Sequence, residues 1–388
     1  MPVVTKFDAI ELAMSILSDP KVNAIFDAIP VETRIVGGTV RDVLRGETPK
    51  DVDFATVAKP DEVIAFLTSK NIQVIETGLK HGTVTAVIDH TPFEITTLRT
   101  DHNHDGRHAD VSYITDFELD AARRDFTANA MSMDRKGNVF DYFDGNAHLK
   151  NKILRFVGNP RKRIEEDALR IMRFFRFLTQ LDFSYGEDDF NACAEMSGSL
   201  ENISKERIWM EVKKIASSPN APRGFAFMKQ AHPLLVHIGA TFKDDPKTMV
   251  MDTTNPITRM TSIGVNVVDL AERWKMANEE SKLANFLGPF YFSRKPISVM
   301  DYQKMIALNN VSVNHAFNLS VLLERKLDPE LFNAMHDAAD ARFPVDGFDM
   351  KDCGMKTGVQ MGETLRRLKE IWVLSKFRAT KEQLLSFV

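Results

Sequence analysis

Two aspartates follow a pair of glycines closely enough for one site to contain both. The segments are Gly37-Gly38 and Asp51-Val52-Asp53. The run 34–36 predicts a buried strand ending in a tight turn at the glycines, where missing Cβ atoms let backbone N–H groups approach a triphosphate. Alternate strand residues face one side, so Asp51 and Asp53 would repel each other unless a cation lies between them. Oxygen-only ligation is typical of Mg²⁺ bound with substrate phosphates, and the combination indicates nucleotidyl transfer.

Each part of this pattern is common by itself, because D-x-D arises by chance and Gly-Gly often marks only a turn. Their closeness in the chain favours the metal site. Glu94, just before Ile95 on a predicted apolar strand, is the candidate third carboxylate, and an ordinary strand-end glutamate explains it equally well. Arg41 follows the glycines within a helical turn and is the candidate triphosphate contact. Asp42 could cap N–H groups or hold a metal-bound water.

A second motif, residues 123–131, contains an arginine and an aspartate side by side. Asp125 is a candidate acceptor for ribose hydroxyls, because an enzyme that makes RNA must distinguish ribose from deoxyribose. Arg124 is a candidate phosphate or base contact. A salt bridge on a helix surface is the alternative for both residues.

A third motif places Asp167, Arg170 and Arg173 three residues apart on one predicted helix, where they share a face. An aspartate accepts from an exocyclic amine, which cytosine and adenine carry, whereas uracil and guanine present a carbonyl there. An arginine donates to ring acceptors. Such a pair would select C and A without a nucleic-acid template. The spacing alone fits an ordinary i,i+3 ion pair better, and the upstream motifs reverse that preference. Glu166 could orient Arg170 or Arg173.

In order and spacing, these motifs together with residues 94–99 resemble those of the class II tRNA nucleotidyltransferases, a family that includes CCA-adding enzymes and bacterial poly(A) polymerases. The resemblance is strong over residues 30–215 and weaker over 343–385. It implies that Asp51, Asp53 and Glu94 are catalytic, with Mg²⁺ on the two aspartates in a two-metal-ion reaction. The residues it implies for nucleotide binding are Gly37, Gly38, Arg41, Arg124, Asp125, Asn129, Asp167, Arg170 and Arg173.

Two segments bear on which product the resemblance implies. Residues 78–87 look like the CCA-adding version rather than the more basic segment of bacterial poly(A) polymerases. Residues 101–113 are predicted to form a polar loop, and in the resembled family a loop here is associated with adding the terminal A. We therefore expect CCA addition to tRNA from CTP and ATP. The alternatives are a poly(A) polymerase of the same family and a catalytically silent RNA-binding protein.

Composition excludes several other classes of protein. The chain has 388 residues, 44% of them hydrophobic and 27% charged, which is ordinary for a globular protein. It contains no run of eighteen apolar residues, so no membrane role is expected. The N-terminus lacks the apolar segment of a secretory signal, and a cytoplasmic location is expected. Two cysteines far apart predict neither a disulfide framework nor a zinc site.

The formal charge of −4 means that RNA contacts must come from local basic patches. No protein partner is implied. Each patch could equally be a solvated helix face. The patches comprise Lys150, Lys152, Arg155, Arg161, Lys162 and Arg163, then Lys205, Arg207, Lys213 and Lys214, and finally Arg366, Arg367, Lys369, Lys376, Arg378 and Lys381.

The elements that position these motifs change character near residue 158. Residues 33–157 alternate short β-branched runs, such as 83–88 and 93–98, with helical signals, such as the helix start at 60–62. Helical periodicity dominates from Pro160 onward. The predicted fold class is α+β: an N-terminal nucleotidyltransferase-type mixed sheet with helices, then an all-helical C-terminal half. With the resemblance, the expected domains are a catalytic head at 1–157, a helical neck for nucleobase recognition at 158–218, a helical body at 219–320 and a tRNA-binding helical tail at 321–388.

Overall fold

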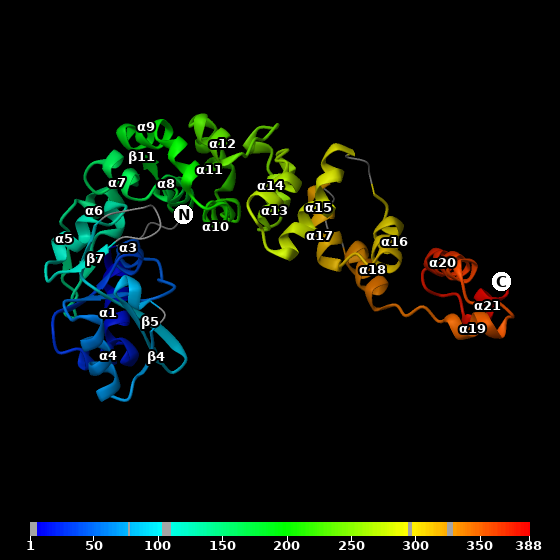
Figure 1. The fold of residues 1–388 in the computed structure, drawn as a ribbon, viewed down its shortest axis with the longest axis horizontal. Helices are drawn as coiled ribbons and strands as arrows, with labels where there is room; N and C mark the ends of the chain where they lie inside the picture. The colour runs from blue at the N-terminus through cyan, green and yellow to red at the C-terminus, as the bar shows by residue number, and fades with distance from the viewer. Residues whose placement is uncertain (1–5, 77, 103–109, 294–296, 324–328) are drawn as a thin grey trace. The chain divides into compact units, whose positions relative to one another are not determined.

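The computed structural model describes residues 6–76, 78–102, 110–293, 297–323 and 329–388. Its contacts form two compact units, one of residues up to 215 together with 227–238, and one of residues 216–226 together with 239–388. The first unit contains a mixed sheet, and the described part of the second is helical (Figure 1). This confirms the predicted α+β class. None of the helices in the described ranges combines the length and apolar character needed to cross a bilayer.

The first unit is built on a seven-stranded sheet in the order β3-β4-β5-β2-β1-β8-β9. Its strands are β1 (Thr33–Val36), β2 (Phe54–Thr56), β3 (Gln73–Ile75), β4 (Thr83–Ile88), β5 (Thr91–Thr97), β8 (Ser132–Met133) and β9 (Val139–Phe140). All four residues of β1 are buried, as the sequence predicts. β2 pairs in parallel with β5, and β1 pairs antiparallel with both β2 and β8. The predicted metal-binding and phosphate-binding segments therefore flank central strands of this sheet.

The prediction of a loop over residues 101–113 is wrong at both ends. β6 (Arg99–His102) and β7 (Asp110–Tyr113) pair antiparallel, with Arg99 opposite Tyr113. Residues 103–109 lie outside the described ranges. The base of this hairpin packs on Gly82, where a Cβ would lie 2.9 Å from the Tyr113 ring. Pairing satisfies the backbone groups that a loop would have left to solvent, and this tertiary contact was not visible in the polar composition of the segment.

The helices that begin before residue 239 surround the sheet or follow it along the chain. They are α1 (Lys6–Ser18), α2 (Pro20–Ala28), α3 (Gly38–Leu44), α4 (Pro60–Ser69), α5 (Phe117–Ala122), α6 (Gly145–Lys150), α7 (Pro160–Glu166), α8 (Leu169–Leu181), α9 (Glu187–Glu195), α10 (Lys205–Ala216), α11 (Ala221–Gln230) and α12 (Pro233–Ile238), with 3₁₀ turns η1 (Leu79–His81), η2 (Thr127–Asn129) and η3 (Ser197–Asn202). Among described residues, the one departure from the predicted helical half is β11 (Ser184–Tyr185), which pairs in parallel with β10 (Ile153–Leu154) of the predicted head.

Aromatic packing fastens α8 to the segments that carry the second motif. The Phe156 and Phe174 rings stack with centroids 5.5 Å apart, and Phe126 lies edge-on to Phe177 at 5.3 Å. Phe126 and Phe174 are fully buried. Burial of such side chains stabilises a fold by about 1.5–3 kcal/mol each. This core therefore holds the second and third motifs in a defined geometry.

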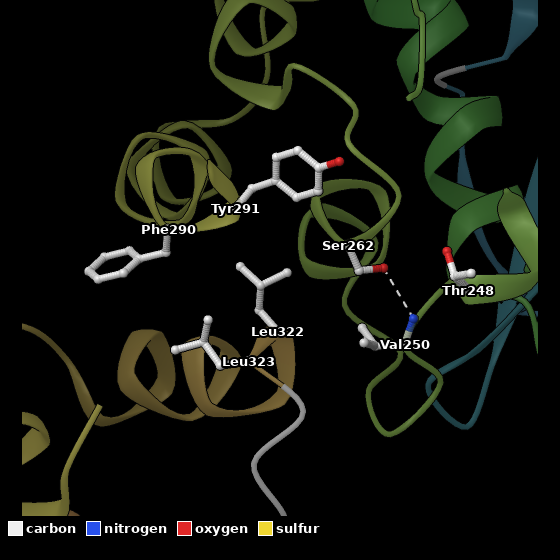
Figure 2. Close-up of a pocket in the computed structure, with 7 residues that line it drawn as sticks. All are labelled: Thr248, Val250, Ser262, Phe290, Tyr291, Leu322 and Leu323. Atoms are coloured by element: carbon white, nitrogen blue, oxygen red, sulfur yellow. Dashed lines mark hydrogen bonds between the residues drawn. The ribbon is translucent and has the colours of Figure 1, made fainter. Parts of the chain in front are cut away.

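The second unit consists of helices packed around their own apolar side chains. These are η4 (Pro246–Thr248), α13 (Pro256–Ser262), α14 (Val267–Arg273), α15 (Asn278–Ser293), α16 (Val299–Asn309), α17 (Val313–Leu322), α18 (Pro329–Asp340), α19 (Gly347–Asp352), α20 (Val359–Leu374) and α21 (Lys381–Leu385). A cavity of about 220 Å³ lies among side chains such as Ser262, Tyr291 and Leu322 (Figure 2). Its Ser262 hydroxyl accepts a hydrogen bond from the Val250 N–H at 3.1 Å.

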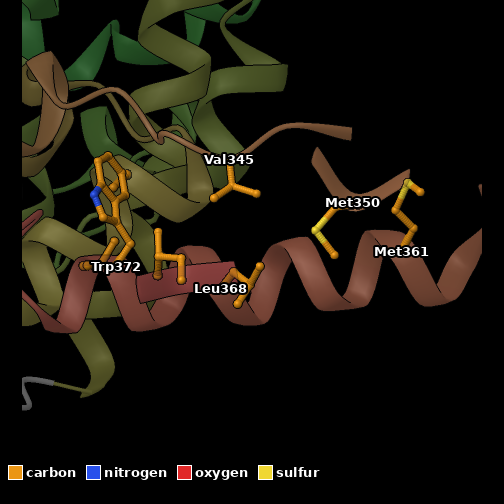
Figure 3. Close-up of a cluster of buried hydrophobic side chains, with 8 residues drawn as sticks. Val345, Met350, Met361, Leu368 and Trp372 are labelled. Atoms are coloured by element: carbon orange, nitrogen blue, oxygen red, sulfur yellow. The ribbon is translucent and has the colours of Figure 1, made fainter. Parts of the chain in front are cut away.

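A small apolar core holds the C-terminal helices together (Figure 3). Met350 of α19, Leu368 and Trp372 of α20 and Leu384 of α21 are buried against one another and against Val345. α21 opens with a capping box, because the Thr380 hydroxyl accepts from the Gln383 N–H. The predicted boundaries at 157, 218 and 320 stay predictions, since the contacts divide the chain into only two units.

Candidate active site

The Gly37-Gly38 turn connects β1 directly to α3. Gly37 has φ +70°, in the left-handed region, and a Cβ there would lie 3.0 Å from Arg124 Nη1. Both the dihedral angle and the approaching guanidinium therefore require glycine. The Gly37 N–H donates to the Met131 carbonyl at 3.2 Å, which ties the turn to the second motif. The predicted strand followed by a tight turn is confirmed.

The two aspartates lie just before β2 rather than within it. The Val36 N–H donates to the Asp53 carbonyl at 2.9 Å, so the β1–β2 ladder extends one residue beyond the assigned strand. In the parallel pairing of β2 with β5, Phe54 lies opposite Ile95, and this register places Asp53 beside Glu94. The sheet thus brings together three carboxylates that are separated by up to 43 positions in the sequence.

The electrostatics of Asp53 show how crowded these carboxylates are. Burial, then the charges of Asp51 and Glu94, raise the pKa of Asp53 from 3.8 to about 6, against the opposing charge of Arg124. Like charges at such a site disfavour ionisation unless a cation compensates them. The donor set of carboxylate oxygens fits Mg²⁺, which binds one or two carboxylates and takes substrate phosphates as further ligands.

Within the described ranges, no three His, Cys, Asp or Glu side chains lie close enough to ligate one ion together. The arrangement therefore suits a pair of aspartates completed by substrate oxygens better than a cage made by protein alone. The role of Glu94 as a third carboxylate stays a prediction.

Thr39 links the glycine turn to the aspartates, and sequence reasoning missed it. Its hydroxyl donates to the Asp51 carbonyl at 3.1 Å and accepts from the Asp53 N–H at 3.3 Å. Thr39 is 2% exposed and lies in the first turn of α3. One buried side chain therefore positions the backbone on both sides of Val52. A threonine two residues after a Gly turn is no signal by itself, because its partners lie twelve and fourteen residues away.

A chain of hydrogen bonds runs from Arg41 across the site to α8. Arg41 Nη1 donates to Asn129 Oδ1 at 2.8 Å, and Asn129 Nδ2 donates to Asp125 Oδ1 at 3.2 Å. Asp125 Oδ2 accepts from Arg173 Nε at 2.8 Å. Asp42 holds Arg41 from its other edge, with both carboxylate oxygens accepting at 2.8 and 2.9 Å. Residues of all three motifs thus belong to one network.

Asp125 is buried, and its ionised form depends on Arg173. Burial would raise the pKa of Asp125, but Arg173, Asn129 and the Phe126 N–H together hold it below its ordinary value. Asp125 therefore does form an ion pair with a helix residue, as the salt-bridge alternative expects, but its carboxylate is buried and not on a surface. Its contact with ribose hydroxyls stays a prediction. Removing one partner from a buried charge pair is costly because the other charge remains desolvated.

Arg124 does pair with a helix residue, although that residue is buried. Its Nη2 lies 3.2 Å from Asp120 Oδ2 in α5. Asp120 also accepts from Arg123 and from the Arg99 N–H. Burial would raise the pKa of Asp120, but Arg123 and Arg124 lower it. Asp120, which sequence reasoning missed, therefore holds Arg124 against Gly37.

The prediction that one helix carries Asp167, Arg170 and Arg173 is wrong for Asp167. α7 ends at Glu166, and Asp167 has φ −150° and ψ 106° in the break before α8. Its Oδ1 accepts from the Leu169 N–H at 3.0 Å, as an aspartate does when it precedes a helix. That preference of aspartate for helix starts was the available signal. The alternative of an i,i+3 ion pair is also wrong for Asp167 and Arg170, because Arg170 pairs with Glu166 and Asp167 pairs with Arg207.

The partners of Asp167 and Arg170 come from elsewhere in the fold. Arg170 Nη1 donates to Glu166 Oε2 at 2.5 Å, which confirms the prediction that Glu166 orients it. Its Nη2 also donates to the Arg123 carbonyl at 2.8 Å. Asp167 Oδ2 accepts from Arg207 Nη2 of α10 at 3.1 Å. Arg207 was predicted only as part of a basic patch.

Comparisons with known proteins identify the family. Residues 33–155 match the family model described as "Poly A polymerase head domain", and residues 182–236 match the one described as "Probable RNA and SrmB- binding site of polymerase A". The human protein named CCA tRNA nucleotidyltransferase 1, mitochondrial, is 36% identical over 92% of this chain and 86% of its own length. The CCA-adding enzyme of Streptococcus pyogenes is 33% identical over 88% of this chain and 91% of its own.

Solved structures share the fold over nearly the whole chain. The Bacillus stearothermophilus CCA-adding enzyme in complex with CTP has a TM-score of 0.76 at 24% identity, covering 95% of this chain and 97% of that one. The Thermotoga maritima CCA-adding enzyme complexed with tRNA has a TM-score of 0.68 at 17% identity, covering 98% and 97%. The motifs, the connected site and the near full-length relatives lead to one conclusion: the chain belongs to the CCA-adding enzyme family of tRNA nucleotidyltransferases.

Proposed function

We propose that this protein completes the 3′ end of tRNA by adding C, C and A from CTP and ATP without a nucleic-acid template. The relatives that match nearly all of the chain bear the names of CCA-adding enzymes. A poly(A) polymerase of the same family has less support, because the family models that bear the poly(A) name match shorter segments, residues 33–155 and 182–236.

The observation that carries the proposal is the network from Arg41 through Asn129 and Asp125 to Arg173. It connects the glycine turn beside the carboxylates to the helix that follows Asp167. A nucleoside triphosphate needs its phosphates, ribose and base held at the same time, and the three motifs in this network supply donors and acceptors for each. Precise positioning accounts for much of the catalysis of phosphoryl transfer.

In the proposed reaction, the 3′ oxygen of the tRNA attacks the α-phosphorus of CTP or ATP, and pyrophosphate leaves. The backbone at Gly37 and Gly38, with Arg41 and Arg124, would hold the triphosphate in line. Asp51 and Asp53 would hold two Mg²⁺ ions, which supply activation of the primer hydroxyl and neutralisation of the leaving pyrophosphate. Thr39 keeps the two aspartates at a fixed distance from the turn.

The recognition residues lie after the carboxylates in the chain. Asp125 would accept from ribose hydroxyls, and Asp167 with Arg170 would read the base edge, which separates C and A from U and G.

We assign the catalytic head to residues 1–157, the neck that reads the base to 158–218, the body to 219–320 and the tRNA-binding tail to 321–388. We place the protein in the cytoplasm. Some relatives carry the word mitochondrial in their names, so fractionation of the source cells would distinguish the two locations.

The direct test is extension of a tRNA that lacks its last three nucleotides, with Mg²⁺ and with CTP and ATP supplied singly or together. Three additions in the order C, C, A followed by a stop support the proposal. A long A ladder on RNA that lacks a tRNA fold would instead identify a poly(A) polymerase. Binding of tRNA with no release of pyrophosphate would identify a silent binder.

The raised pKa of Asp53 predicts how activity depends on pH. Because Asp53 must lose its proton to bind a cation, the rate at limiting Mg²⁺ should rise as the pH increases through about 6. Saturating Mg²⁺ competes with the proton and should move the midpoint to lower pH. Initial rates between pH 5 and 8 at two Mg²⁺ concentrations measure this. If the pH midpoint of the rate is the same at both Mg²⁺ concentrations, Asp53 is not a Mg²⁺ ligand.

Replacing Thr39 with valine should weaken Mg²⁺ binding while preserving the fold. Valine keeps the shape of the side chain but leaves the Asp51 carbonyl and Asp53 N–H without their shared partner. If the loss of these hydrogen bonds weakens Mg²⁺ binding by about 1 kcal/mol in total, the Mg²⁺ concentration needed for half-maximal activity rises roughly 5-fold. Mg²⁺ titrations of activity and of thermal stability measure it. Thr39→Ser should restore the wild-type requirement.

Thr33→Val is the matched control for this substitution. Thr33 is also buried, and its hydroxyl donates to Thr56 in the same sheet, but it does not contact the aspartates. An equal change in Mg²⁺ requirement for Thr33→Val and Thr39→Val would show that the effect reflects general loosening of the sheet.

A further inference from the structure

We propose that Arg207 is a positioning residue for base selection, holding the Asp167 carboxylate in the orientation that reads the exocyclic amine. The proposal rests on the proposed function and adds to it a residue of α10. Sequence reasoning placed Arg207 only in a basic patch for RNA. The structure instead directs its guanidinium to the carboxylate that is proposed to contact the base.

The Asp167 carboxylate is held from two sides. The Leu169 N–H donates to Oδ1 at 3.0 Å, and Arg207 Nη2 donates to Oδ2 at 3.1 Å and more weakly to Oδ1 at 3.4 Å. Each carboxylate oxygen can accept more than one hydrogen bond, so these contacts leave acceptor capacity for a ligand. The Asp167 side chain is 29% exposed, which leaves it accessible to a nucleobase. The two donors therefore set the direction of the remaining lone pairs without occupying all of them.

Arg207 is itself carried by a helix that is anchored to α8. One turn after Arg207, Glu211 is buried and accepts from Arg176 Nε at 2.5 Å. Ile208 and Val212 of the same helix are also buried. α10 is thereby fixed to the helix that carries Arg170 and Arg173. Asp167 lies in the break between α7 and α8, where its N–H donates to the Arg163 carbonyl at 3.5 Å and its carbonyl accepts from the Arg170 N–H at 3.0 Å. These backbone contacts leave the carboxylate itself to be oriented by side-chain and neighbouring donors, so a partner on a fixed helix has a clear effect.

This arrangement predicts a specific kinetic signature for Arg207→Ala. Without its partner, the Asp167 carboxylate samples other orientations, and part of the binding energy for cytosine and adenine is spent on ordering it. We expect the KM for CTP and ATP to rise about 5- to 20-fold, while kcat changes less than about 3-fold. The ratio of CMP to UMP incorporation should fall by a similar factor, and the KM for tRNA should stay within about 2-fold of wild type. Arg207→Lys, which keeps a cation near Asp167, should recover most of the selectivity.

Arg135→Ala is the matched control. Arg135 also pairs with an aspartate across the fold, at 2.6 Å from Asp27, and its side chain is partly exposed like that of Arg207. It lies outside the network described above. This variant should keep both the KM for CTP and the CMP-to-UMP ratio of the wild type.

The experiment measures extension of a tRNA that lacks its last three nucleotides by wild type, Arg207→Ala, Arg207→Lys and Arg135→Ala, together with equilibrium binding of CTP and UTP to each protein without tRNA. Loss of CTP-over-UTP preference in Arg207→Ala, with recovery in Arg207→Lys, supports the proposal. A raised KM for tRNA with unchanged CTP preference would assign Arg207 to RNA binding and overturn it. Equal losses for CTP and UTP would also overturn it. Failure of the wild type to add C or A would refute the proposed function, and this outcome is distinct because it requires no variant.

Discussion

Replacing Asp53 with alanine is expected to lower nucleotide incorporation by roughly 10³-fold or more, the size of effect seen when a charge-stabilising group is removed from phosphoryl transfer. Asp53 lies at the junction of β1, β2 and β5, beside Asp51, Glu94 and the glycine turn. No other described side chain can replace its carboxylate at that position without moving the strand. Single-turnover extension of tRNA at saturating CTP and Mg²⁺ measures the loss.

The same site predicts that Asp53→Asn makes the metal-free protein more stable. A carboxyl whose pKa rises on folding binds its proton more tightly in the folded state, so its ionised form opposes folding above that pKa. The shift in the pKa of Asp53 from 3.8 to about 6 limits the gain in the free energy of unfolding to about 3 kcal/mol at pH 7.5. Solvent screening should reduce that gain to about 1–2 kcal/mol. The gain should grow as the pH rises from 3.8 to 6 and then level off.

Chemical unfolding with and without Mg²⁺ separates this effect from damage to the fold. Mg²⁺ should stabilise the wild type and have little effect on Asp53→Asn, because the variant has lost a ligand. Asp61→Asn, at an exposed position in the first turn of α4, is the control and should match the wild type in both assays. Turnover of Asp53→Ala within 10-fold of wild type would refute the assignment of Asp53.

Replacing Asp167 with asparagine is expected to relax base selection while leaving the carboxylate site intact. A carboxylate only accepts, so it suits the amine of cytosine or adenine and repels the carbonyl of uracil or guanine. An amide offers both an acceptor and a donor and can therefore meet either base edge. A lost discrimination of about 1–3 kcal/mol corresponds to a roughly 10- to 100-fold lower preference for CTP over UTP. Competition between the two nucleotides in tRNA extension measures it.

The control for Asp167→Asn is Asp188→Asn, an exposed carboxylate in the first turn of α9. It should leave the preference unchanged. If Asp167→Asn lowers incorporation of CTP and UTP equally, Asp167 supports the fold of the α7–α8 break and does not read the base.

Comparison of the second and third motifs shows why some features could be predicted and others could not. The buried strand before Gly37, the strand 83–88 and the change to helices near Pro160 all follow from local periodicity and residue type. The break at Asp167 between α7 and α8 also had a local signal, but the apolar periodicity that continues across it outweighed the preference of aspartate for helix starts. The β6–β7 hairpin had only weak local signals in a polar segment.

The sequence by itself determined the glycine turn, the adjacency of Asp51 and Asp53, the order of the motifs and the division into a mixed-sheet part and a helical part. These depend on neighbours within a few residues, whose geometry is set by backbone dihedral angles. Only the tertiary structure decided that Asp125 pairs with Arg173, that Asp167 pairs with Arg207 and that Thr39 bridges the aspartates. Those partners lie 12 to 48 residues apart, and packing of buried side chains, which no local pattern encodes, determines which charges and hydroxyls meet.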